Sequence, residues 1–318
     1  MVSNTPEAKL KQFMKIAITG ATGLVGSRLV AQLKQQGHQI LVFTRNPSKA
    51  QKVFPAAAYS NLEIVQYTPQ ESGNWQQRIS GCDAVVNLAG EPIAERWSPQ
   101  QKEAIKQSRQ IVTRKLVEAI AMAESKPQVL VSGSAIGYYG TSETTAFDET
   151  SGAGSDFLAQ VCQTWEAEAQ KVTEFGVRLV ILRIGIVLAN GGALGKMIGP
   201  FQMFAGGPIG SGRQWFSWIH RDDLVNLICR AVEDDNMSGV YNATAPNPVR
   251  MGQLCQTLGE VMNRPSWLPV PDFVLEVLLG DGAIVVLEGQ QVLPKKTQAS
   301  GFNYQYPELK PALAEIVK

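Results

Sequence analysis

The stretch TGATGLVG is the sequence feature that most constrains what this chain can fold into. It places Gly20, Gly23 and Gly26 between an apolar run, MKIAITG, and a segment with the helical spacing of leucine and valine. In a strand–turn–helix unit, the first glycine permits a tight turn, the second lets the backbone approach a pyrophosphate, and the third allows close helix–strand packing. Free N–H groups at the helix N-terminus then favour an anion. The stretch therefore predicts a dinucleotide site; the alternative for this G-x-x-G-x-x-G spacing is a glycine-rich turn without a ligand.

Strands alternate with helices along most of the chain. Further elements are predicted as strands at Gln39–Arg45, Asp83–Gly90, Pro127–Ala135 and Val177–Leu188, and as helices over Pro99–Ala123 and from Asp156 onward. This alternation predicts an α/β fold with a Rossmann-type doubly wound parallel sheet. Beyond residue 188 the chain becomes rich in glycine and proline, which predicts a smaller, loop-rich C-terminal substrate lobe. We predict a polar tail at 1–12, a nucleotide-binding domain at 13–188, and at 189–318 a mixed region that forms the lobe and completes the sheet.

Composition limits the classes of partner. The chain has 318 residues, and its 29 Lys and Arg nearly balance its 28 Asp and Glu. It therefore has no broad field to attract nucleic acid or an anionic membrane. No apolar run approaches the roughly 20 residues of a membrane-spanning helix. Four cysteines without a CxxC pair, and only two histidines, predict no metal site and the reduced thiols of a cytoplasmic protein.

The end of the second predicted strand indicates which dinucleotide binds. Folds that bind NAD usually carry Asp or Glu there to hold the ribose 2′-hydroxyl. This chain has Thr44 and Arg45, with Lys49 nearby and no acid. Because Arg forms a charge-assisted, bidentate pair with phosphate, the sequence favours NADP(H) over NAD. The alternative for Arg45 is a solvated surface charge.

Several motifs together carry a resemblance to a known family. TGATGLVG, NLAG and SGSAIGYYG resemble an extended short-chain dehydrogenase/reductase. The motifs RW, SR, GGPIGSG and WIH are similar to one atypical, epimerase-like branch, some members of which carry a cell-division-inhibitor (SulA-type) label. From about residue 264, RPSWLPVP and EGQQVLPKKTQASGF resemble that branch's C-terminal domain of unknown function. The resemblance implies NADP(H) binding and supplies no substrate.

The resemblance also implies site residues. The cofactor-binding positions that it implies are Gly20, Thr22, Gly23, Leu24, Val25, Gly26, Thr44, Arg45, Leu88, Ala89, Gly90, Glu91, Arg109, Ser134 and Cys162. Ser134 takes the family's active-site Ser/Thr position, and Arg109 takes a helical position where typical members often have Asn. Glu91 is expected beside the nicotinamide. The alternatives are a buried Ser at a strand end and an Arg in a surface ion pair.

The usual acid/base pair of the family is missing. In typical members a Tyr is the general acid/base, and a Lys four residues later lowers its pKa and holds the nicotinamide ribose. Counting back from Glu166, these positions are Leu158 and Cys162, on an apolar helix face that predicts simple packing. The catalytic candidates that remain are Ser134, Tyr138 and His220.

Two functions stay open at this point. His220 also reads as part of a helix start in SWIHRDDL, which favours a structural or substrate-facing role. A predicted cleft containing Arg183, Gln214, Trp218 and His220 favours an NADP(H)-dependent oxidoreductase or epimerase-like enzyme acting on a small molecule. The missing Tyr and Lys favour a non-catalytic NADP(H)-sensing regulatory protein, linked to cell division by the label of its relatives.

Overall fold

A seven-stranded parallel sheet forms the centre of the computed structural model, which describes residues 13–318. The polar tail predicted at 1–12 lies outside the described residues. The strands are β1 Lys15–Thr19, β2 Gln39–Thr44, β3 Leu62–Gln66, β4 Ala84–Asn87, β5 Val129–Ala135, β7 Arg178–Ile184 and β11 Gly239–Ala243. Their order across the sheet is β11-β7-β5-β4-β1-β2-β3. This is the predicted Rossmann-type doubly wound sheet.

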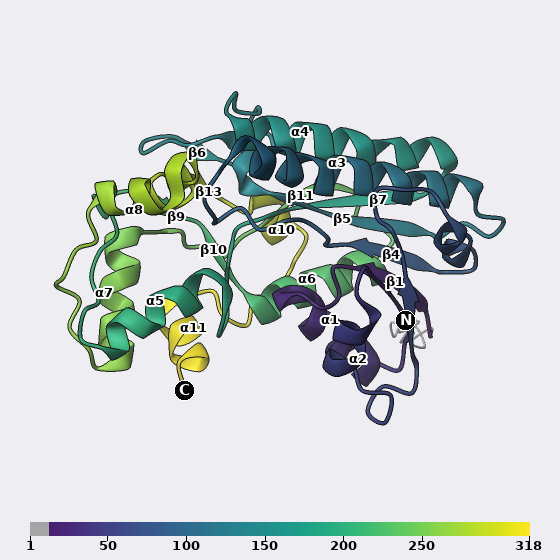
Figure 1. The fold of residues 1–318 in the computed structure, drawn as a ribbon, viewed down its shortest axis with the longest axis horizontal. Coiled ribbons are helices and arrows are strands. Elements are labelled where there is room, and N and C mark those ends of the chain that lie inside the picture. The colour runs from purple at the N-terminus through teal and green to yellow at the C-terminus, as the bar shows by residue number, and fades with distance from the viewer. Residues whose placement is uncertain (1–12) are drawn as a thin grey trace, which may run out of the picture.

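Helices cover both faces of the sheet (Figure 1). On one face lie α1 Leu24–Gln35 and α6 Arg221–Glu233, with α2 Pro47–Val53 beside them; on the other lie α3 Pro99–Met122 and α4 Phe157–Gln170. Short 3₁₀ turns, η1 Asn74–Ile79, η2 Ile136–Tyr139 and η3 Lys171–Phe175, lie in the connections. Because α6 and β11 follow residue 188, the sheet and its covering helices are built from residues before and after that position.

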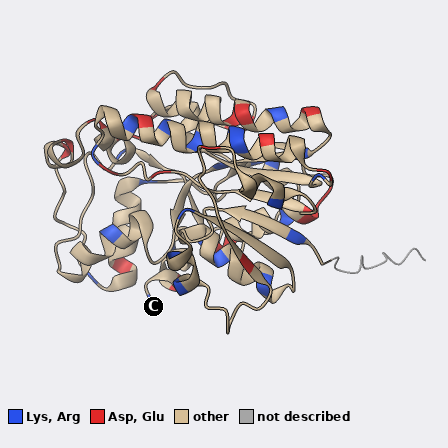
Figure 2. Ribbon diagram, turned by 45° about the vertical axis from the view of Figure 1, so that its right-hand side comes forward, with Lys and Arg blue, Asp and Glu red and all other residues tan. Residues whose placement is uncertain are grey.

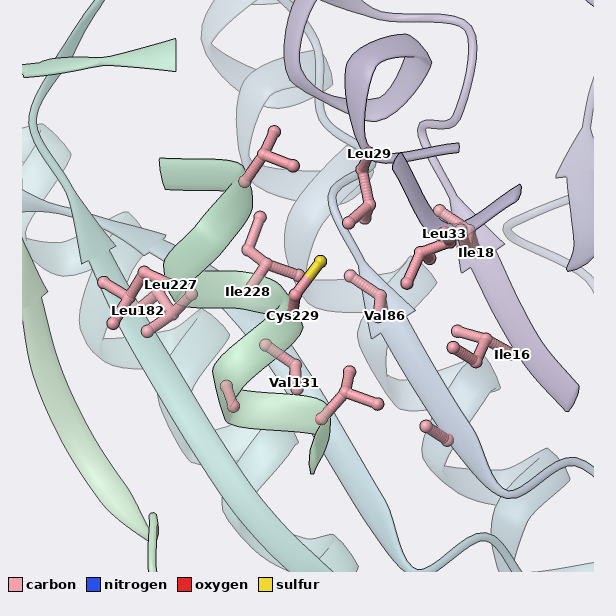
Figure 3. Packing of buried hydrophobic residues seen from close by; sticks show 14 of the residues in the cluster. Ile16, Ile18, Leu29, Leu33, Val86, Val131, Leu182, Leu227, Ile228 and Cys229 are labelled. Atoms are coloured by element: carbon pink, nitrogen blue, oxygen red, sulfur yellow. The ribbon is translucent and has the colours of Figure 1, made fainter. Parts of the chain in front are cut away.

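The core on the α1–α6 face consists of aliphatic side chains in close contact (Figure 3). Leu29 and Leu33 of α1 and Leu227 and Ile228 of α6 meet the sheet, and all four are 0–1% exposed. The helical spacing of the two leucines in α1 is what turns both toward the strands. A bidentate ion pair between Arg28 and Asp222 (2.9 and 3.0 Å) joins the two helices at the solvent side.

The predicted strand Val177–Leu188 is two strands in the structure, so this prediction is wrong in part. β7 ends at Ile184, and β8 Ile186–Leu188 leaves the main sheet to pair with β10 Trp218–His220. Gly185 lies at the break, where a Cβ atom would approach the Ser217 carbonyl oxygen to 2.7 Å. The close contact between Gly185 and the Ser217 backbone therefore accompanies a change of direction within the apolar run 177–188.

The remaining elements build a lobe beyond the carboxyl edge of the sheet. Its helices are α5 Gly192–Gln202, α7 Met251–Met262, α8 Asp272–Leu279, α9 Ile284–Leu287 and α11 Leu309–Ile316, with η4 Gly280–Ala283. The short helix α10 Lys295–Ala299 instead packs beside the edge strand β11 of the main sheet. Two further short pairs are β9 Trp215–Phe216 with β12 Val249–Arg250, and β6 Ala146–Phe147 with β13 Gln291–Val292. Trp218, which is 0% exposed, lies in the lobe's own apolar cluster with side chains of α5, α7 and α11.

Charges of both signs are interspersed over the helices and loops (Figure 2). The sequence has nearly equal numbers of acidic and basic residues, and the structure adds that the two signs are mixed in space. Across residues 13–318, none of the helices combines the length and the apolar character needed to cross a bilayer.

Candidate cofactor cleft

A cleft of about 820 Å³ opens at the carboxyl ends of the strands. The strand order runs outward in opposite directions from β1 and β4, and ligands of doubly wound sheets bind at such a reversal. The lining residues are Gly20, Ala21, Thr22, Gly23, Phe43, Thr44, Arg45, Tyr67, Pro69, Gln70, Leu88, Ala89, Gly90, Glu91, Pro99, Gln100, Glu103, Ala104, Gln107, Ser108 and Val112. The structure thus brings together the phosphate turn, the end of β2 and the NLAG segment.

The three glycines of the phosphate turn have different surroundings. Gly20 has a φ of +70°, and a Cβ there would lie 2.6 Å from the Leu88 carbonyl carbon. At Gly26 a Cβ would overlap the backbone of Gly20 and Ala21. Gly23 meets only the Gly20 carbonyl oxygen, at 3.3 Å, and it lines the cleft. Gly20 and Gly26 are therefore needed to build the turn, whereas Gly23 borders the space for a ligand.

The N-terminus of α1 presents unpaired backbone donors beside this turn. Its N-cap is Gly23, which offers no side-chain acceptor to the first turn. The N–H groups of Leu24, Val25 and Gly26 have no partner within the helix, as at any helix start. These amides and the helix dipole suit the pyrophosphate of a dinucleotide. The Leu24 side chain lies against Gly191 of the lobe, so the lobe begins next to the turn.

Arg45 reaches across the cleft and is not a free surface charge. Its side chain is 69% exposed, and its Nη1 donates to Glu91 Oε1 at 3.1 Å. The Glu91 backbone is held by Ser108 Oγ, which accepts from the Glu91 N–H at 3.0 Å. The carboxylate of Glu91 is therefore paired with Arg45 in this structure, and its expected place beside the nicotinamide stays a prediction. Thr44 is buried, and its hydroxyl bonds with the Asn46 backbone.

Ser134 at the end of β5 belongs to a buried polar network. Its hydroxyl donates to Glu166 Oε1 at 2.6 Å, and Arg183 binds both oxygens of that carboxylate at 2.9 and 2.8 Å. Arg183 also donates to the Tyr139 hydroxyl at 3.0 Å. Burial would lower the pKa of Arg183, but hydrogen bonds and attraction from Glu166 outweigh it and raise that pKa. Burial raises the pKa of Tyr139.

Tyr138 stands at the edge of this network. The Arg183 guanidinium lies 3.3 Å from the centre of the Tyr138 ring. Tyr138 is half-buried, and its hydroxyl makes no hydrogen bond to any part of the chain within 13–318. Of the catalytic candidates, Tyr138 is thus the one whose polar head keeps its hydrogen-bonding capacity.

The α4 helix carries the residues that replace the usual acid/base pair. Cys162 is 4% exposed, and its thiol donates to the Ala135 carbonyl at 3.7 Å. Burial raises the pKa of this thiol to about 11. The Leu158 side chain lies next to Gly137, where a Cβ would be 3.3 Å away. Both side chains fill space against β5 and η2, as their apolar pattern predicts.

The cleft predicted to contain Arg183, Gln214, Trp218 and His220 does not coincide with the cofactor cleft, because these four residues are interior. Arg183, Gln214, Trp218 and His220 are 4%, 2%, 0% and 1% exposed, and none of them lines the cleft. His220 is the N-cap of α6, and its Nδ1 accepts from the Asp222 N–H at 3.2 Å. Its Nε2 lies 3.1 Å from Glu315 of α11. The polar groups of SWIHRDDL thus secure a helix start, in line with the structural interpretation.

Sequence reasoning missed one wall of the cleft. The segment after β3 contributes Tyr67, Pro69 and Gln70, and the start of α3 contributes Glu103 and Gln107. Burial raises the pKa of Tyr67 to about 12. The available signal was the short alternating stretch LEIVQ before Tyr67, a third strand whose carboxyl end must open onto the same edge.

Arg109 of α3 lies directly behind the NLAG segment. A Cβ at Gly90 would come within 3.1 Å of the Arg109 guanidinium carbon, so the two positions are in contact. Ser134, Cys162 and Arg109 are therefore near the end of β4 and β5 but do not line the open cleft.

Comparison with known proteins places the whole chain among described sequences. The NAD dependent epimerase/dehydratase family matches residues 16–244, and a domain of unknown function (DUF1731) matches residues 270–316. An epimerase family protein SDR39U1 homolog from Arabidopsis thaliana, described as chloroplastic, is 54% identical over 96% of this chain and 87% of its own length. The epimerase family protein YfhF of Bacillus subtilis is 40% identical over 96% of this chain and 98% of its own.

One solved structure is also similar throughout. Human epimerase family protein SDR39U1 (isoform 2), crystallised with NADPH, is 35% identical and superimposes with a TM-score of 0.84. The match covers 95% of this chain and 99% of the human one. The resemblance that the motifs predicted is confirmed over both the sheet unit and the C-terminal segment.

Proposed function

The chain belongs to the NAD dependent epimerase/dehydratase family, and from this we propose that it binds NADPH and acts as an oxidoreductase or epimerase-like enzyme on a small molecule. The observation that carries the proposal is the cleft itself, which joins a glycine turn, a free helix N-terminus and Arg45 in one space. The NADPH in the similar human structure supports the choice of cofactor.

The residues present fit the cofactor. A cradle for the pyrophosphate is formed by Gly20, Thr22 and Gly23 together with the first amides of α1. Residues larger than glycine at positions 20 and 23 would put side chains into this turn. Arg45 and Thr44 stand at the end of β2, where a 2′-phosphate would pair with the guanidinium. Leu88, Ala89, Gly90 and Glu91 form the facing wall. When bound, NADPH supplies hydride transfer.

The chain's own contribution to chemistry lies at the end of β5. Ser134 donates its proton to Glu166, so its oxygen lone pairs are left to accept a hydrogen bond from a substrate hydroxyl. Tyr138 offers a phenol proton to a substrate oxygen, with a guanidinium on its ring face. We assign Tyr138 as the proton donor and Ser134 as the residue that positions a substrate with a hydroxyl or carbonyl group.

A second candidate function is a non-catalytic NADPH sensor that acts through a partner protein, in the setting of cell division or elsewhere. The one observation that favours it is that Leu158 and Cys162 replace the family's Tyr and Lys. For either function, four cysteines that are buried and form no disulfide support a reducing, cytoplasmic compartment.

Titration with both cofactors tests the proposal. We expect wild type to bind NADPH more tightly than NADH, and Arg45→Ala to weaken NADPH binding roughly ten- to a hundredfold by removing a charged hydrogen bond of about 1.5–3 kcal/mol. The affinity for NADH should change little, because it has no 2′-phosphate. Lys52→Ala, which removes an exposed charge from the last turn of α2 outside the cleft lining, is the matched control and should leave both affinities near wild type. Equal affinity of wild type for the two cofactors would contradict the proposal.

A further inference from the structure

The lobe carries a large apolar surface that is exposed to solvent at its outer edge. Seven of the eleven large apolar side chains that are exposed within residues 13–318 lie here. They come from the end of α5, from the segment before α8 and from α8 itself, and we call them the apolar face: Met203, Phe204, Trp267, Leu268, Phe273, Val277 and Leu278. Their exposed fractions range from 43% for Leu268 to 73% for Met203.

Two segments far apart in the sequence join to form this face. Residues 203–209 run beside residues 264–270. A parallel bridge joins Gly206 to Ser266, and the Trp267 N–H donates to the Gly206 carbonyl at 3.0 Å. The chain then continues into α8, and Figure 1 shows α5, α7 and α8 together at this end of the molecule. The apolar face therefore lies along one edge of the lobe.

The apolar face is not used for packing within the chain that the structure describes. None of the eight residues of α8 is buried, whereas the apolar stripe of a surface helix normally faces a core. Phe204 has a φ of +61°, a left-handed conformation that is rare and costly for a bulky residue. Backbone strain of this kind is concentrated at functional and binding sites. Phe204 thus holds its ring at the surface in a conformation that the exposed ring does not repay.

The size of the apolar face suits a stable protein interface. Aromatic side chains have about 150–250 Å² each, so the exposed fractions of Phe204, Trp267 and Phe273 amount to roughly 300–450 Å². The other four members add to this area and bring it towards the about 800 Å² that each partner contributes to a standard interface. Apolar patches beyond a few hundred Å² on a single chain mark interaction sites.

The charges beside α8 complement a second copy of the same face. Asp272 is the first residue of α8, and the exposed Arg96 lies towards its other end, where Nη1 donates to the Val277 carbonyl at 2.6 Å. Within residues 13–318 neither Asp272 nor Arg96 forms an ion pair. When two such helices pack antiparallel about a twofold axis, the acidic start of each α8 meets the arginine at the end of the other.

We propose that the apolar face is a homodimer interface, against which a second copy of this chain packs the same face, with the two α8 helices antiparallel. The pairing covers the exposed rings of both copies and forms two ion pairs, each between Arg96 of one copy and Asp272 of its partner. An anionic membrane suits the face less well, because the chain has no Lys or Arg between Arg264 and Lys295. The inference does not depend on the proposed function, since the face lies outside the cofactor cleft.

Sedimentation equilibrium of the full chain, from about 0.1 to 100 µM, tests the interface. We expect wild type to dimerise in this range. Phe273→Ser should raise the dissociation constant of the dimer about a hundredfold or more, because a twofold axis removes the ring from both sides of the interface. Phe175→Ser changes an exposed aromatic side chain on η3, outside the apolar face, and is the matched control that should leave the constant unchanged.

Two charge variants test the antiparallel arrangement. Arg96→Asp places acids at both ends of α8, and Asp272→Lys places bases at both ends, so each variant alone should dimerise about tenfold or more weakly than wild type. An equimolar mixture of the two should form a heterodimer with nearly the wild-type constant, because each ion pair is then restored with one residue from each variant. The double variant Arg96→Asp with Asp272→Lys should likewise dimerise as wild type does.

Three results would overturn the inference. Wild type could remain monomeric throughout, including a monomer that co-sediments with vesicles of phosphatidylcholine and phosphatidylglycerol and so uses the face on a membrane. A dimer that Phe273→Ser leaves unchanged would use another surface. A mixture of the two charge variants that dimerises no better than either alone would exclude the antiparallel pairing. Should Phe273→Ser fail to fold, as circular dichroism would reveal, the mixture decides, because both charge variants alter exposed side chains.

Discussion

At the scale of single residues, the catalytic candidates differ in what each polar group is bound to. The Ser134 hydroxyl donates its proton to Glu166, Arg183 pairs with the same carboxylate, and the Cys162 thiol is buried with a pKa of about 11. At pH 7.5 such a thiol is almost entirely protonated, so it is neither a base nor a nucleophile. Tyr138 alone retains a hydroxyl that is not committed to residues 13–318. This is why we propose Tyr138, rather than Ser134 or Cys162, as the proton donor.

A matched pair of variants tests this assignment. Tyr138→Phe removes only the hydroxyl and should lower the turnover of NADPH with a panel of carbonyl compounds by about 10²–10⁴-fold, the range of general acid catalysis. Cys162→Ser should leave turnover within a few-fold, because the neutral thiol only fills space. NADPH affinity should be close to wild type in both. Turnover lost in Cys162→Ser and kept in Tyr138→Phe would reverse the assignment, and no wild-type turnover on any carbonyl would favour the sensor.

At the scale of elements, the turn between β1 and α1 shows what sequence reasoning reaches and where it stops. The glycine spacing predicted a tight turn here, and the structure has one bordering the cleft, because positive φ at Gly20 and close approach at Gly26 leave few other residues possible. The same reasoning joined β7 and β8 into one strand, since an apolar run does not record that Ser217 forces a bend at Gly185. It also did not reveal that Glu91 pairs with Arg45, because that contact depends on two loops far apart in sequence.

Two glycines of this turn should respond differently to substitution. Gly23→Val should abolish NADPH binding while the circular dichroism spectrum and melting temperature stay near those of wild type, because its side chain would enter the ligand space. Gly26→Ala should instead lower the free energy of unfolding by about 1–3 kcal/mol, because its Cβ overlaps the backbone of Gly20 and Ala21. Thermal melts without ligand, together with NADPH titrations, measure both. Retained NADPH binding by a folded Gly23→Val protein would count against this turn as the site.

At the scale of the whole molecule, three buried thiols make the stability of the protein depend on pH. Cys82 lies in the core under α3, Cys162 on α4, and Cys255 in the lobe, with exposures of 2%, 4% and 0%. In each, burial raises the pKa from 9.0 to about 11. The burial of these three thiols in separate parts of the interior could not be predicted from cysteine spacing, because spacing alone does not distinguish a core cysteine from a surface one.

These thiols predict a loss of stability in alkali. A group whose pKa is higher in the folded state contributes stability that is present below its unfolded value and lost as the pH rises through the folded value. The free energy of unfolding should therefore fall between about pH 9 and 11, by at most about 2–3 kcal/mol per thiol at 1.36 kcal/mol per pKa unit. Urea denaturation of wild type and Cys255→Ala across this range measures the effect of one thiol. The variant should be less stable near neutrality, because it leaves a small cavity, yet the gap between the two proteins should narrow by about 2–3 kcal/mol at pH 11. Tyr67, with a pKa of about 12, titrates equally in both and cancels from the difference. A gap that stays constant from pH 7 to 11 would show that the folded protein does not hold this thiol in its neutral form.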